Sequence, residues 1–188
     1  MPEHVFWIVS RGAGIAALLL SSAAVALGLM MSGRLAKAHA KDLRPLHETL
    51  SLVTIAALVL HAGALLGDGY LSPGLADITV PFVFVYEPLW TGIGIVAGWL
   101  LVVLGLSFYV RGRIGVQRWR KLHRFTALAW VMAIGHSLGA GTDADRWWFL
   151  AACALVVLPT LALLSTTLFA NSQVAHTPDR GPSPRIAP

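Results

Sequence analysis

Long segments without formal charge dominate this chain and restrict where it can fold. The first, residues 12–32, is 21 residues long and contains no Asp, Glu, Lys or Arg. A helix needs about 20 residues to cross the hydrocarbon core of a bilayer. The 56% content of hydrophobic residues and the mean hydropathy of +0.71 exceed what a soluble domain of 188 residues can bury. We therefore predict an all-α integral membrane protein.

Four further charge-free segments of similar length complete a polytopic bundle of about five transmembrane helices. They are residues 49–67, 88–110, 125–142 and 147 to about 170. We expect residues 1–170 to form a single transmembrane domain. Residues 171–188 contain four prolines and few apolar residues, and such a composition predicts a disordered tail.

The distribution of charge predicts the orientation of these helices. Residues 111–124 contain six basic and no acidic residues, and residues 33–48 are also rich in Lys and Arg, whereas residues 67–87 contain three acidic and no basic residues. Cytoplasmic loops of membrane proteins carry an excess of Lys and Arg. We thus predict a multi-pass protein of the cell membrane with the N-terminus outside and the C-terminus cytoplasmic. Because topology explains the net charge of +5, no nucleic-acid partner is expected.

The single cysteine, Cys153, lies within an apolar segment. It excludes a disulfide framework and the Cys-x-x-Cys-His motif of covalent haem attachment. We interpret it as a small buried residue.

Two of the predicted spans carry two histidines each. His47 and His61 are fourteen residues apart, and His123 and His136 are thirteen apart. Only one span separates these two segments, so both helices run from the cytoplasm outward. His47 and His123 are then near the cytoplasmic side, and the other two lie about 21 Å further out at 1.5 Å per residue. The topology predicts two cross-helix pairs of histidines.

Helical geometry accommodates the first spacing better than the second. Fourteen residues return to within about 40° of the same helix face, whereas thirteen leave His136 about 140° away from His123. Gly135 and Gly139 flank His136 and would permit a bend or the close approach of a bulky group.

The chemistry of these pairs favours haem over the alternatives. Two neutral imidazoles facing each other can bind haem iron axially, and such sites usually carry electrons. Structural zinc would require three or four ligands at one level. Packing or a proton relay would explain one intramembrane histidine, but burying four at matched depths is costly without a ligand.

Three sequence features are similar to those of a known family: Trp7-Ile8-Val9-Ser10-Arg11-Gly12, the His47/His61 spacing, and Trp119-Arg120-Lys121-Leu122-His123-Arg124 with His136. With them, residues 6–143 resemble the ferric reductase-like transmembrane domain of ferric reductases and NADPH oxidases. The resemblance implies two b-type haems, an inner one on His47 and His123 and an outer one on His61 and His136, with electrons passing from the cytoplasm outward. For Arg11, which is costly within a span, it suggests contact with an outer haem propionate; snorkelling to lipid headgroups is the alternative.

Partners and alternatives follow from the same resemblance. Family enzymes that act alone carry a flavin and nicotinamide domain after the last span, and only a short tail follows here. We therefore expect an oxidoreductase component with no catalytic acid, base or nucleophile, reduced by a separate flavin reductase or by quinol. The outer acceptor would be a protein or a ferric species.

One alternative is a cytochrome b subunit that links quinol or a reductase to a periplasmic partner such as a methionine sulfoxide reductase. A haem-free bundle whose histidines relay protons is another.

Two further features have structural interpretations. Gly94 and Gly98 form a GxxxG pattern, which favours close packing of helices within the molecule. Trp90, Trp119, Trp147 and Trp148 lie at predicted membrane boundaries, where we expect them to act as interfacial anchors.

Overall fold

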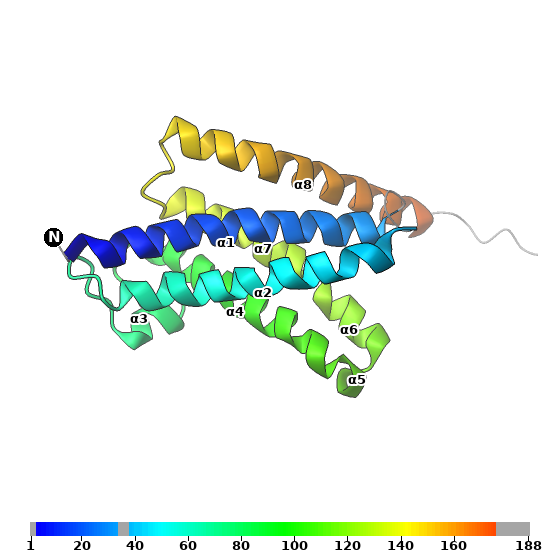
Figure 1. Cartoon of the computed structure of the whole chain (residues 1–188), viewed down its shortest axis with the longest axis horizontal. Helices are drawn as coiled ribbons and strands as arrows, with labels where there is room; N and C mark the ends of the chain where they lie inside the picture. The colour runs from blue at the N-terminus through cyan, green and yellow to red at the C-terminus, as the bar shows by residue number, and fades with distance from the viewer. Residues whose placement is uncertain (1–2, 34–37, 176–188) are drawn as a thin grey trace, which may run out of the picture.

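The computed structural model describes residues 3–33 and 38–175, and within these residues every regular element is helical. Five helices form the bundle in Figure 1: α1 (Glu3–Ser32), α2 (Ala40–Leu65), α4 (Pro88–Leu106), α7 (Phe125–Gly139) and α8 (Trp147–Ala175). The predicted all-α class is confirmed. Helices α4, α7 and α8 begin at the residues predicted as the starts of the last three charge-free segments.

Four helical segments among the described residues are long and apolar enough to cross a membrane: His4–Ser32, Ala40–Leu65, Pro88–Ile114 and Trp147–Phe169. The remaining predicted span is α7, whose 15 residues cover about 22 Å. It ends at Gly139 and is therefore shorter than the predicted segment 125–142. The protein is a multi-pass membrane protein, and the orientation derived from charge stays a prediction.

The helices alternate in direction along the bundle. In Figure 1, α2 and α7 run toward the end where the chain begins, and α1, α4 and α8 run away from it. The largest interfaces are those of α1 with α2 and of α4 with α7. The two helices that carry histidines are thus parallel, and each is packed against an antiparallel neighbour.

A buried tryptophan fixes α7 against α1. Trp130 is fully buried, and its indole Nε1 donates a hydrogen bond of 2.9 Å to Ser22 Oγ. The hydroxyl of Thr160 on α8 donates to the backbone carbonyl of Ser22 at 3.4 Å. Buried side-chain polar groups are thereby paired within the apolar bundle. This contact region holds α1, α7 and α8 together.

Both connections at the ends of α4 contain short helices. The basic segment 111–124 includes α5 (Arg111–Ile114) and α6 (Val116–His123), which meet at Gly115 with φ of 90°. A positive φ favours glycine at this turn. The segment before α4 contains α3 (Leu75–Thr79).

Helix α8 continues to Ala175, past the predicted domain boundary at residue 170. The rest of the predicted tail, residues 176–188, lies outside the described residues, as do Arg34 and Lys37 of the first basic segment.

Candidate functional site

The four histidines lie in two pairs between α2 and the α6–α7 segment. The ring centroids of His47 and His123 are 6.2 Å apart, and those of His61 and His136 are 6.3 Å apart. The ring planes within each pair are inclined by 82° and 69°, respectively. All four side chains are half-buried. Each pair therefore joins two imidazoles from different helices at one level of the bundle.

The separation of the rings suits one metal ion between each pair. A bond of about 2.0–2.1 Å from an imidazole nitrogen to a first-row metal, plus roughly 1.1 Å from that nitrogen to the ring centre, places two centroids about 6.2 Å apart. No group of three or more His, Cys, Asp or Glu side chains suitable for a metal occurs in the described part of the chain. The donor set thus fits a metal with two axial protein ligands, as in haem, better than tetrahedral zinc.

Three of the imidazoles are oriented by backbone carbonyls of neighbouring helices. The Nδ1 atoms of His47, His61 and His136 lie 2.9, 2.8 and 3.0 Å from the carbonyl oxygens of Ala24, Ser10 and Trp90, respectively. Because a carbonyl only accepts, each Nδ1 carries the proton and donates it. The lone pair of a neutral imidazole is then on Nε2, the atom available to a metal.

A glycine follows each of these carbonyls by four residues, and it makes room for the ring. A Cβ atom at Gly14 would lie 2.9 Å from His61 Nδ1, one at Gly28 would lie 3.4 Å from His47 Cε1, and one at Gly94 would overlap the ring of His136. In a helix, the Cβ atom of residue i+4 points back toward the carbonyl of residue i. A side chain at Gly14 or Gly94 would therefore displace the imidazole from the carbonyl, whereas a Cβ atom at Gly28 would only be in van der Waals contact with the ring.

These contacts repeat along α1 with the spacing of the histidines on α2. The carbonyls of Ser10 and Ala24 are fourteen residues apart, as are Gly14 and Gly28, which matches the interval between His47 and His61. Because α1 and α2 are antiparallel, one register places each histidine of α2 against a carbonyl of α1 and the glycine four residues after it. Residue composition alone did not reveal this repeat.

The first glycine of the GxxxG pattern in α4 lies against α7, which agrees with the predicted close packing within the molecule. Gly94 accommodates the ring of His136, whereas a Cβ atom at Gly98 would have no heavy atom within 4 Å. Gly94 thus admits the imidazole of His136 between the two helices.

The thirteen-residue step has its origin beside His123. Helix α6 ends at His123, and α7 begins at Phe125 after a turn at Arg124. Thr126 Oγ1 donates a hydrogen bond of 2.7 Å to the carbonyl of His123 at this interruption. The helix is therefore irregular between the two histidines, at a residue whose backbone stays in the right-handed helical region (φ −62°, ψ −24°), so the offset of an ideal helix is not imposed on them.

Gly135 and Gly139, which flank His136, accommodate a bulky group as one of our two interpretations proposed. That group is the indole of Trp90, which lies 3.6 Å from a Cβ position built at Gly135 and would overlap one at Gly139. The side chain of Trp90 thus packs on α7 while its carbonyl accepts from His136.

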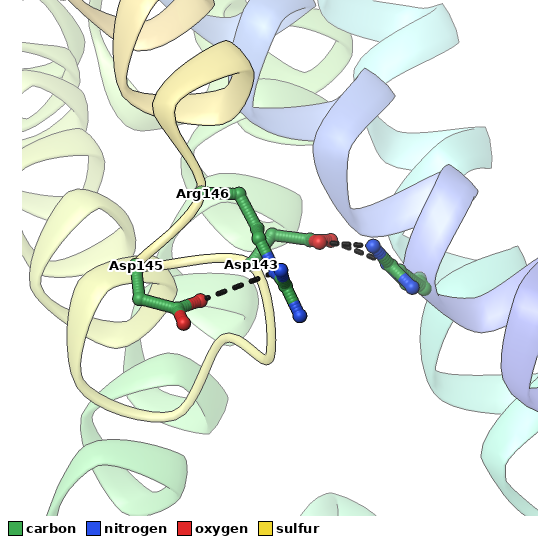
Figure 2. Close-up of polar contacts among 4 residues, drawn as sticks. Asp143, Asp145 and Arg146 are labelled. Atoms are coloured by element: carbon green, nitrogen blue, oxygen red, sulfur yellow. Dashed lines mark hydrogen bonds and ion pairs between the residues drawn. The ribbon is translucent and has the colours of Figure 1, made fainter.

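Arg11 lies one residue after Ser10 but faces a different group. Its Nε and Nη2 atoms form a bidentate ion pair with Asp143 in the loop between α7 and α8, and its guanidinium lies 4.8 Å from the centroid of the Trp7 ring. Figure 2 shows the carboxylate of Asp143 pointing toward α1, apart from the exposed pair formed by Asp145 and Arg146. This contact ties the start of α1 to the loop near the His61–His136 pair.

Comparison with known proteins identifies the family. The family model described as ferric reductase like transmembrane component matches residues 13–134, which contain His47, His61 and His123 and end two residues before His136. No curated protein and no solved structure gives a significant match. The match covers well over half of the chain, and the helical bundle with its paired histidines agrees with the resemblance found in the sequence. This chain belongs to the ferric reductase-like transmembrane component family.

Proposed function

We propose that this protein transfers single electrons across the membrane through two b-type haems, each held by one pair of histidines. The observation that supports this most is the separation of 6.2–6.3 Å between the imidazole centroids of each pair. Family membership supports transmembrane electron transfer as the general activity. Haem, when bound, supplies a reversible one-electron change of the iron oxidation state.

The protein would contribute ligands, their orientation and their spacing. Hydrogen bonds from Nδ1 of His47, His61 and His136 to helix carbonyls fix the tautomer and the plane of each ring before a metal binds. Helix α2 sets the distance between the two levels, because fourteen residues of α-helix extend about 21 Å. The apolar bundle around the rings keeps the local dielectric constant low.

The electron donor would be a separate flavin reductase or quinol at the end of the bundle that carries the basic helices α5 and α6. We propose this because basic residues mark the cytoplasmic side. Arg11, which lies near the other level, would contact a propionate of the outer haem in addition to Asp143. Its two contacts with Asp143 use two of its five N–H groups.

The segment between α2 and α4 favours an acceptor protein over a free ferric species. Asp68 is buried and accepts a hydrogen bond from the backbone N–H of Leu71, and Asp77 accepts one from Gly74 at the start of α3. Two of the three carboxylates that would attract a cation are thus engaged by the loop itself. The same segment exposes large apolar side chains, including Tyr70 and Val85. Such a surface suits a cytochrome b subunit with a periplasmic protein partner.

A reduced-minus-oxidised optical spectrum of the purified protein, with the haem-to-protein ratio, tests the proposal. We expect the absorption bands of b-type haem at two haems per chain. A colourless protein after expression with ample haem would instead support the haem-free bundle with proton-relaying histidines. A ratio of one would show that only one pair binds.

A further inference from the structure

At one of the four histidines, His123, the glycine found beside the other three is missing and the contact with the backbone carbonyl is weaker. Leu104 follows Trp90 by fourteen residues on α4, and its backbone lies near His123, as that of Trp90 lies near His136. The residue four positions later is Phe108, where the other three sites have glycine. The Nδ1 atom of His123 is buried and lies near the Leu104 carbonyl, but within residues 3–33 and 38–175 it makes no hydrogen bond of normal geometry.

The carbonyl that would serve His123 has another donor. Ser107 Oγ donates a hydrogen bond of 2.6 Å to the Leu104 carbonyl oxygen. Ser107 Oγ in turn accepts a hydrogen bond of 3.0 Å from the indole Nε1 of Trp119. Three residues thus form a chain of hydrogen bonds at the position where, in the other sites, a backbone carbonyl accepts from an imidazole.

The indole at the end of this chain lies against the imidazole. Trp119 and His123 are four residues apart on α6, and their rings are stacked with centroids 4.9 Å apart and planes inclined by 26°. Residues at this spacing share a helix face. Phe108 contacts the same indole edge-on at 5.8 Å. The side chain at the position of the missing glycine therefore supports the ring that covers His123.

We propose that Trp119 is the positioning residue of His123, and that its stacked indole, anchored by Ser107, gives His123 the orientation that a well-aligned hydrogen bond gives the other three histidines. This inference rests on the proposed function, because its consequence concerns a bound haem. A ligating imidazole that donates from its second nitrogen becomes more basic. The contact of His123 with the Leu104 carbonyl falls short of normal hydrogen-bond geometry, so its orientation depends on the stacked ring, and only the His47–His123 haem responds to changes at Trp119.

Substitutions at Trp119 separate stacking from hydrogen bonding. Trp119→Leu removes both, Trp119→Phe keeps an aromatic ring but no N–H group, and Ser107→Ala removes the anchor of the indole. Trp99→Leu is the matched control, because Trp99 also donates its indole N–H, to the carbonyl of Thr79, and has no aromatic contact with a histidine among the described residues. Each variant would be purified and examined by redox titration and by electron paramagnetic resonance (EPR).

In Trp119→Leu we expect one of the two midpoint potentials and one of the two ferric EPR signals to shift, while the other potential and signal keep their wild-type values. Trp119→Phe should restore both toward wild type, and Trp99→Leu should change neither. If Trp119→Phe shifts the potential and the EPR signal as far as Trp119→Leu does, stacking is not the contact that positions His123. If the wild-type protein binds two haems and neither Trp119→Leu nor Ser107→Ala changes the EPR signals or midpoint potentials, this inference is overturned and the proposed function stands. Wild-type protein without haem would overturn the proposed function and this inference with it.

Discussion

Arg11 of α1 and Asp143 of the loop between α7 and α8 form a bidentate ion pair in which the carboxylate is almost fully buried. The family resemblance suggested a haem propionate as the partner of Arg11, with snorkelling to lipid headgroups as the alternative, and neither included Asp143. The predicted contact of Arg11 with a haem propionate stays a prediction. The pair closes the bundle beside the His61–His136 level, so it links the folding of the loop to that site.

Substitution of Arg11 should destabilise the protein more than substitution of Arg146, the exposed partner of Asp145. Arg11→Leu leaves the carboxylate of Asp143 buried without its cation, and we expect a loss of about 1–3 kcal/mol, below the value for a fully buried pair because the Arg11 side chain is 33% exposed. Arg146→Leu, which removes the exposed partner of Asp145, should have little effect. Unfolding of the purified protein in detergent measures both. Equal stability of the two variants would contradict a structural role for the Arg11 pair.

His61→Ala should remove one haem and leave the other. The substitution deletes one ligand of the His61–His136 pair, and the His47–His123 pair is about 21 Å away along α2. The haem-to-protein ratio should fall by half, with one component of the redox titration retained. His39→Ala is the control, since His39 is exposed immediately before α2. A similar loss of haem in both variants would argue against the assignment of ligands.

Much of the fold was predictable because each long helix has a local signal. Charge-free length identified the five long helices of the bundle. The parallel direction of the two histidine helices, seen in Figure 1, required only that one span separate them. The interruption at Arg124 was not predicted, because neither proline nor glycine occurs there to signal it.

The groups that orient the histidines were beyond sequence analysis for a different reason. Three of them are backbone carbonyls, which every residue has, so no residue type marks them. Their glycines are visible, but Gly94 suggested packing of helices until the ring of His136 was found against it. Trp119 was interpreted as an interfacial anchor, and only the structure shows its ring stacked on His123.

A methyl group added at Gly94 should weaken the His61–His136 site specifically. In Gly94→Ala the new Cβ atom would overlap the ring of His136, so the ring must leave the carbonyl of Trp90 or the helices must separate. Gly98→Ala, one turn later on the same helix, places its Cβ where no heavy atom lies within 4 Å. We expect haem loss, or a shift of one midpoint potential, in the first variant only. Identical redox titrations for the two variants would show that the space left by the missing side chain at Gly94 does not orient His136.

The ring planes predict the magnetic properties of the oxidised protein. When two axial imidazoles are nearly perpendicular, their π interactions with a low-spin ferric ion are spread over two d orbitals, which stay close in energy and give a strongly anisotropic EPR signal. The angle is 82° for His47–His123 and 69° for His61–His136, so we expect two such signals, with the greater anisotropy at the first pair. EPR of the ferric wild-type protein and of His61→Ala assigns them, because the variant should lose the less anisotropic signal. Signals typical of parallel imidazole planes at both sites would show that the rings rotate when haem binds, and that the carbonyl contacts of His47, His61 and His136 do not hold them.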